Sequence, residues 1–204
     1  MSYEIEIIRK DELQTNNWSG GTTTQLAIYP KDSQYSERNF KWRLSSAKVE
    51  VEESTFTSLP DINRIIMIID GALHLEHEGH HKSLLKPFEQ DSFSGNWTTK
   101  SFGKVTDFNL MTSKGCEGNL EAIHIEKDKY SKILLENKDS SASTHALYCI
   151  NGCVKIHSST GELLNLSNGD LLVLQMNDNF KKMNLEIHNE KDMRVNLIKS
   201  SMKY

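Results

Sequence analysis

The sequence has few cysteines and no long hydrophobic run. Its 204 residues include only Cys116, Cys149 and Cys153, an odd number in a chain of this size. This count fits reduced thiols in the cytosol better than a framework of disulfides, so a cytoplasmic protein is expected. No stretch approaches the roughly 18 apolar residues that a membrane-spanning helix needs. The first residues alternate apolar and acidic side chains, whereas a signal peptide begins with a basic region followed by an apolar one.

An excess of positive charge is also missing. The chain has 24 basic and 28 acidic residues, for a net charge of −4, and the two signs are mixed along its length. Proteins that bind nucleic acid or anionic membranes usually concentrate Lys and Arg on one face. Neither nucleic acid nor a membrane is therefore expected as a partner.

Helical periodicity is scarce, and only Ile8 to Leu13 has a pattern that suits a helical turn. Short alternating or β-branched runs dominate instead, separated by Gly, Pro, Asn and Ser. Such runs predict strands at Tyr3–Ile8, Thr22–Tyr29, Phe40–Val51, Arg64–Leu75, Lys104–Met111, Leu120–Ile125, Lys132–Leu135, His145–His157, Leu171–Gln175, Asn184–His188 and Met193–Ile198. Strands at this spacing indicate an all-β sandwich or barrel.

The chain contains an internal repeat centred on two glycines. Asp70-Gly71 and Asn151-Gly152 lie 81 residues apart, and apolar residues recur at matching positions around them. Each glycine supplies the positive φ of a tight turn, which predicts a β-hairpin at each site. We therefore expect two copies of one β-module. The predicted division is an N-terminal module at residues 1–115, with the ligand pocket, and a C-terminal module at residues 116–204.

The repeated pattern resembles the cupin superfamily, and its N-terminal half resembles the HutD/Ves family within it. The similarity is carried by Trp18–Ile28, Phe40–Ala47, Phe56–Arg64, Asp70-Gly71, Leu85–Glu89 and Asp107–Thr112. The resemblance implies a bicupin, that is, two cupin-like (RmlC-like jelly-roll) β-barrels in one chain. It also implies a link to bacterial histidine utilisation, because HutD proteins are encoded with those genes. The biochemical activity of the family is unsettled.

The metal ligands typical of cupin enzymes are absent from their expected positions. Those enzymes hold a divalent metal through a His-x-His pair, a Glu and a later His. Arg64 and His145 occupy the place of the Glu in the two copies, and the segment Thr57–Pro60 has no histidine where the pair should be. We therefore predict no metal or other cofactor, and His145 is expected to be a core or rim histidine.

A second group of histidines follows the first repeated turn. His74, His77, His80 and His81 lie close together in the sequence, with Glu76 and Glu78 among them. The turn at Gly79 would bring His80 or His81 near His77. The group is interpreted as a solvated hairpin tip, with capture of Zn or Ni as the alternative.

Polar residues at positions where the strand pattern expects apolar ones predict a ligand pocket in the N-terminal module. Alternation places Thr23 with Gln25, Arg43 with Ser45, and Asp107 with Asn109 on common faces. The predicted ligand-binding residues are Thr23, Gln25, Arg43, Ser45, Arg64, Phe93, Asp107 and Asn109. Arginine binds a carboxylate through two parallel hydrogen bonds, and Asp107 and Asn109 accept from an amide, amine or imidazole. Trp18, Phe93 or Trp97 would wall the site, although Arg43 and Asp107 would also suit a structural ion pair.

The sequence therefore favours a metal-free bicupin that binds a small carboxylate-bearing metabolite, and the family link suggests an intermediate of histidine breakdown. Whether it is an enzyme stays open. One alternative is a metal-independent isomerase, epimerase or hydrolase with Asp107 as general base. Another is a regulatory or interaction protein. A homodimer is expected, because a sheet edge is available for pairing.

Overall fold

The computed structural model describes residues 3–137 and 142–204. These residues form nineteen strands and two short 3₁₀ helices, η1 (Lys10–Glu12) and η2 (Tyr35–Glu37), and contain no α-helix. No helix in this part of the chain is therefore long and apolar enough to cross a membrane. The prediction of an all-β chain with a helical turn near residue 10 is confirmed. The chain divides into two units, one at Leu13–Gly118 and one that combines Met1–Glu12 with Asn119–Tyr204.

The N-terminal unit (Leu13–Gly118) contains two sheets. The six-stranded sheet has the order β2 (Gln14–Trp18), β3 (Gly21–Tyr29), β4 (Trp42–Val49), β11 (Val105–Ser113), β6 (Ile62–Gly71) and β9 (Gln90–Ser94). The four-stranded sheet has the order β5 (Glu53–Thr55), β10 (Thr99–Phe102), β7 (Leu73–His77) and β8 (Lys82–Leu85).

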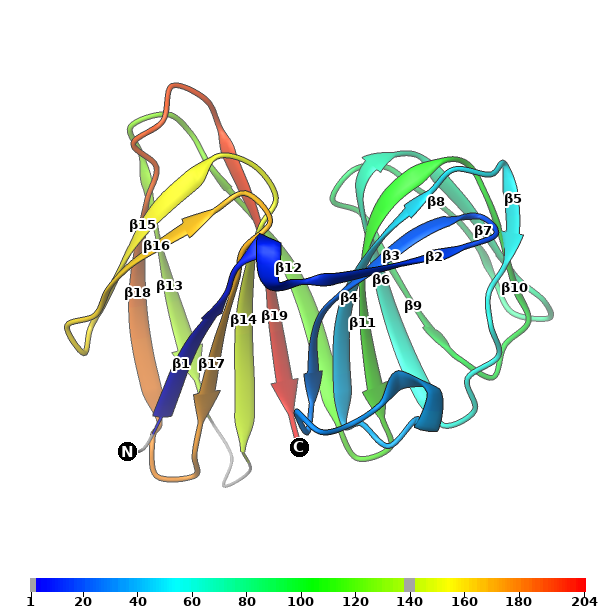
Figure 1. The fold of residues 1–204 in the computed structure, drawn as a ribbon, viewed down its shortest axis with the longest axis horizontal. Coiled ribbons are helices and arrows are strands. Elements are labelled where there is room, and N and C mark those ends of the chain that lie inside the picture. The colour runs from blue at the N-terminus through cyan, green and yellow to red at the C-terminus, as the bar shows by residue number, and fades with distance from the viewer. Residues whose placement is uncertain (1–2, 138–141) are drawn as a thin grey trace. The chain divides into compact units, whose positions relative to one another are not determined.

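The C-terminal unit also contains two sheets. Its five-stranded sheet has the order β1 (Tyr3–Ile8), β17 (Leu171–Met176), β14 (Ser143–Cys149), β19 (Val195–Lys203) and β12 (Glu117–Ile125). Its four-stranded sheet has the order β13 (Tyr130–Glu136), β18 (Lys182–His188), β15 (Cys153–Ser158) and β16 (Leu163–Ser167). Figure 1 shows β1, in blue, beside β17, with which it pairs. The predicted division at residue 115 had instead assigned this strand to the N-terminal module.

The strand order repeats between the units. The order β4-β11-β6-β9 corresponds to β12-β19-β14-β17, and β5-β10-β7-β8 corresponds to β13-β18-β15-β16. The matching strands carry the two halves of the sequence repeat. Arg64 in β6 and His145 in β14, for example, occupy equivalent positions of that repeat. The predicted barrels are not what the described residues form, because no sheet closes on itself and each unit is a pair of open sheets.

The two repeated turns connect one sheet to the other. Gly71 and Gly152 have φ of +87° and +69°, as predicted for tight turns. However, β6 and β7 belong to different sheets of the N-terminal unit, and β14 and β15 to different sheets of the C-terminal unit. The predicted hairpins at these turns are therefore corners. A side chain at Gly71 would also collide with the backbone, since its Cβ would lie 2.5 Å from the carbonyl oxygen of Lys104.

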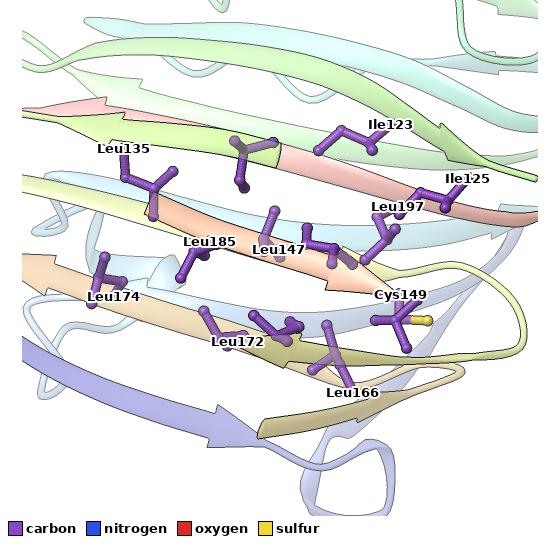
Figure 2. Close-up of a cluster of buried hydrophobic side chains, with 14 of the residues drawn as sticks. Ile123, Ile125, Leu135, Leu147, Cys149, Leu166, Leu172, Leu174, Leu185 and Leu197 are labelled. Carbon is purple, nitrogen blue, oxygen red and sulfur yellow. The ribbon is translucent and has the colours of Figure 1, made fainter. Parts of the chain in front are cut away.

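Aliphatic side chains fill the interior of the C-terminal unit. Figure 2 shows side chains from the five-stranded sheet, such as Leu147 and Leu172, beside others from the four-stranded sheet, such as Leu166 and Leu185. The alternation predicted from the sequence produces this core, because every second residue of a strand faces the opposite sheet. The interior of the N-terminal unit differs, since its apolar cluster around Ile66, Ile68 and Leu75 accompanies a polar cavity.

Candidate functional site

A cavity of about 360 Å³ opens into the N-terminal unit. The inner faces of β4 and β11 form its floor, and the segment Ser54–Thr57 and Tyr35 form part of its wall. The predicted site residues that line it are Thr23, Arg43, Ser45, Arg64, Asp107 and Asn109. A volume of this size is at the lower end of the range for small-molecule sites.

Strand register explains why the two arginines share this cavity. Met111 in β11 is paired with Arg43 in β4 on one side and with Arg64 in β6 on the other. Residues in one cross-strand row point to the same face of a sheet. Asp107 and Asn109 precede Met111 at intervals of two along β11, so their side chains lie on the same face. The register of β11 against β6 shifts between Thr106 and Asp107, and such bulges re-aim side chains locally.

Arg43 is held at one end of the cavity by neutral groups. Its Nε donates to Gln25 Oε1 at 2.9 Å, and its Nη1 donates to Ser45 Oγ at 3.1 Å. The guanidinium lies over the ring of Tyr35, 4.3 Å from the ring centroid. Burial lowers the pKa of Arg43, and the nearby Tyr35 opposes this effect. The side chain is thus oriented without an acidic partner to neutralise it.

Arg64 is buried between aromatic rings. Its guanidinium lies 4.6 Å from the ring centroid of Phe56 and 5.2 Å from that of Phe93. Its Nε has no hydrogen-bond partner among the described residues. Burial lowers the pKa of Arg64 to about 10, although Tyr35 and Asp107 favour its charged form. An arginine with this pKa is still charged at neutral pH.

Asp107 and Asn109 present acceptor atoms with no partner. In the part of the chain that the structure describes, Asp107 Oδ1 and Asn109 Oδ1 are buried and accept no hydrogen bond. Burial raises the pKa of Asp107 to about 7, while the charge of Arg64 and the backbone N–H of Ala47 oppose this. The ion pairs formed by the described residues do not include one between Asp107 and either arginine, so the alternative of a structural Arg43–Asp107 pair is not supported. Unpartnered buried groups cost about 1–3 kcal/mol each, which a bound ligand would recover.

The remaining predicted site residues lie behind the cavity surface. Gln25 accepts from Arg43, and Phe93 packs against Arg64, so both contact an arginine without lining the cavity. Trp18 lines the cavity with 40 % of its surface exposed, whereas Trp97 stacks on His80. The sequence did not reveal Tyr35 or the segment Ser54–Thr57, because neither belongs to a regular alternating run.

The C-terminal unit lacks this polar constellation. His145 replaces Arg64, and the register places Leu197 where the N-terminal unit has Asp107. His145 is buried, as predicted, with its Nδ1 2.9 Å from Ser201 Oγ. Burial lowers its pKa to about 4. A smaller cavity of about 180 Å³ in this unit is lined by residues such as Lys155, His188 and Glu190.

The family model of HutD matches residues 10–195, which is most of the chain. The chain belongs to the HutD family. This confirms the resemblance predicted from the sequence motifs, and it extends that resemblance into the C-terminal half. No curated protein matches the chain.

Solved structures support the same assignment at the level of fold. PA5104 from Pseudomonas aeruginosa PAO1, a conserved protein of unknown function, is 20 % identical with a TM-score of 0.80, and the match covers 98 % of this chain and 100 % of that one. HutD from Pseudomonas fluorescens SBW25, determined in a formate condition, is 22 % identical with a TM-score of 0.68 over 97 % and 98 % of the two chains. The oxalate decarboxylase–formate complex from Lactobacillus farciminis, a cupin-fold protein, is 8 % identical with a TM-score of 0.68 over 95 % and 85 %. The chain therefore has a cupin-type β fold.

Proposed function

We propose that this HutD-family protein binds a small carboxylate-bearing metabolite in the cavity of its N-terminal unit. The observation that carries the proposal is the pair of buried guanidinium groups, Arg43 and Arg64, placed on either side of Met111 in one row of the sheet. The cavity holds one carboxyl group against these two cations. An anionic ligand would balance the charge, and planar guanidinium groups bind carboxylates with two parallel hydrogen bonds.

The unpartnered side-chain oxygens of β11 indicate that the ligand also carries hydrogen-bond donors. Asp107 Oδ1 and Asn109 Oδ1 would receive N–H groups, so the favoured metabolite carries both a carboxylate and an amide, imidazole or formimino nitrogen. Urocanate and formiminoglutamate have this composition, and both are intermediates of histidine breakdown. Formate accompanies two similar structures, since HutD from Pseudomonas fluorescens was determined in a formate condition and the oxalate decarboxylase structure is a formate complex.

The proposal is tested by a thermal-shift screen of protein without an affinity tag. The screen covers urocanate, formiminoglutamate, histidine, glutamate and formate. A ligand at 100 times its Kd adds about 2.7 kcal/mol to the free energy of unfolding, enough to raise Tm by several degrees. We expect Arg43→Ala to weaken binding at least ~10-fold, because the lost guanidinium contact is charge-assisted.

The matched control is Arg194→Ala, which removes a half-exposed arginine of the C-terminal unit. It should bind like the wild type. Unchanged affinity in a folded Arg43→Ala protein would refute the proposal, as would a screen in which no carboxylate shifts Tm.

One observation favours a second candidate function, that of a metal-independent isomerase, epimerase or hydrolase. A general base works best with a pKa near the working pH, and burial raises the pKa of Asp107 to about 7. If the protein turns over its ligand, Asp107→Asn should abolish turnover while retaining binding. Turnover that survives this substitution would assign the proton transfer to another group.

A further inference from the structure

Two histidines and one aspartate converge outside the cavity, where β7, β8 and β9 meet. His77 ends β7, His81 precedes β8, and Asp91 lies in β9. The turn between β7 and β8 holds the histidines together, since the backbone N–H of His77 donates to the carbonyl of His81 at 2.9 Å. One ligand atom from each of the three side chains lies within 4.8 Å of the other two. None of the three residues lines the cavity.

We propose that His77, His81 and Asp91 form a binding site for one Zn²⁺ ion. The Nε2 atom of His81 lies 3.0 Å from both carboxylate oxygens of Asp91, and the Nε2 atom of His77 lies 3.2 Å from Oδ2. Two ligands that each bind zinc at about 2.0–2.2 Å in a tetrahedral site are roughly 3.3–3.6 Å apart. The two histidine–aspartate separations are therefore within a few tenths of an ångström of those that a bound ion sets, and the three ligand atoms all lie within 4.8 Å of one another.

The hydrogen bonds around His77 favour a tautomer that can bind metal. Its Nδ1 lies 2.8 Å from the hydroxyl of Thr99, and that hydroxyl donates to the carbonyl of Trp97 at 3.4 Å. The proton of Thr99 is thus directed away, so Thr99 accepts from the Nδ1–H of His77. The lone pair on Nε2 then faces the carboxylate of Asp91. Two acceptors in contact repel each other unless a proton or a metal ion lies between them, and a bound Zn²⁺ would relieve this repulsion without protonation of either group.

The surroundings fix the geometry of the three ligands. The side chain of His77 is fully buried, with its ring centroid 4.6 Å from that of Phe93 and 5.6 Å from that of Trp97. The hydroxyl of Ser83 donates to Asp91 Oδ2. Outer hydrogen bonds of this kind orient the ligands of metal sites. The burial of His77 corrects the expectation of a solvated hairpin tip for this residue, whereas His80 and His81 are exposed as expected.

The donor set selects the class of metal. Two imidazoles and one carboxylate suit Zn²⁺ and leave its fourth position to water, whereas Mg²⁺ and Ca²⁺ prefer oxygen ligands alone. His81 is 42 % exposed at its side chain, so an ion can reach the site from solvent.

The test is isothermal titration of ZnCl₂ into the full chain, without an affinity tag and freed of metal by chelator dialysis. We expect one Zn²⁺ per chain and no saturable binding of Mg²⁺ or Ca²⁺. His81→Ala and Asp91→Asn should abolish binding, and Thr99→Val should weaken it about 10–100-fold, because Thr99 acts through His77. Circular dichroism verifies the fold of each variant, and the exposed position of His81 means that His81→Ala tests the site without disturbing the core.

The matched controls are His74→Ala and His80→Ala, which remove neighbouring histidines that are not in the site. They should bind zinc like the wild type. Equal loss in these controls would show capture by exposed histidines and overturn the proposal. Zinc binding retained in both His81→Ala and Asp91→Asn, no saturable zinc binding, or saturable binding of Mg²⁺ or Ca²⁺ would also overturn it.

Discussion

Asp107→Asn should raise the free energy of unfolding by up to about 4 kcal/mol above pH 7 and leave it near the wild-type value below pH 4. Burial raises the pKa of this carboxyl group from its ordinary value of 3.8 to about 7. Between these two pH values the folded chain keeps a proton on Asp107 that the unfolded chain has lost, so the contribution of Asp107 to the stability of the wild type falls as pH rises. Each unit of pKa difference corresponds to about 1.4 kcal/mol, and an amide never ionises.

Chemical denaturation of both proteins at several pH values between 4 and 8.5 measures this difference. Asp70→Asn is the matched control, because Asp70 belongs to the same unit but is exposed. A constant difference between Asp107→Asn and wild type across the pH range would show that the cavity does not penalise the charged carboxylate. The same outcome would weaken the case for Asp107 as a general base, since that role depends on the raised pKa.

His145→Gln should remove one contribution that lowers the stability of the wild type as pH falls. Burial lowers the pKa of His145 from 6.5 to about 4, with further lowering by the charges of Lys199 and Lys203. Between pH 6.5 and 4 the unfolded chain binds a proton at this residue that the folded chain does not, so His145 by itself lowers the stability of the wild type by up to about 3 kcal/mol as pH falls through this range. Glutamine does not titrate, so the free energy of unfolding of the variant minus that of the wild type should grow as pH falls through this range.

The comparison is again a set of denaturation curves, with the exposed His157→Gln as control. A difference between His145→Gln and the wild type that stays constant with pH would show that burial does not lower the pKa of His145. The contributions of Asp107 and His145 have opposite signs and overlapping pH ranges. Each single variant should therefore show a steeper dependence on pH than the wild type does.

The strands that bury one face were predictable from the sequence, and the short polar strands were not. Tyr3–Ile8 was predicted with its observed bounds, and the long central strands β4, β6 and β11 lie within or close to predicted runs. The strands β2 and β5 were missed because their residues are mostly exposed and carry no alternation of apolar with polar side chains. The turn at Gly71 was predicted correctly in its backbone conformation, but local sequence does not say whether the strands it joins pair with each other.

The candidate site was predictable where its residues lie on alternating strands. Arg43, Ser45, Asp107 and Asn109 share a face by the two-residue period alone, and strand register brings Arg64 to them. The positions of Tyr35 and Phe56 beside the arginines are set by where their loops pack against the sheet. No local sequence pattern predicts this. The site at His77, His81 and Asp91 depends on the approach of β9 to the β7–β8 turn, which is also a long-range property of the fold.

The pairing of β1 with β17 has a consequence for the order in which the protein forms during synthesis. The ribosome makes β1 before the strands of the N-terminal unit, whereas Leu174, the partner of Ile5, emerges long after the last strand of that unit. All strands of that unit are therefore synthesised before β17, the pairing partner of β1, has been made. Contacts so distant in sequence form slowly, and unpaired strand edges invite association between chains. Glu4 and Glu6 place negative charge on β1 while it is unpaired. Charge on an unpaired strand disfavours its pairing with the same strand of another nascent chain.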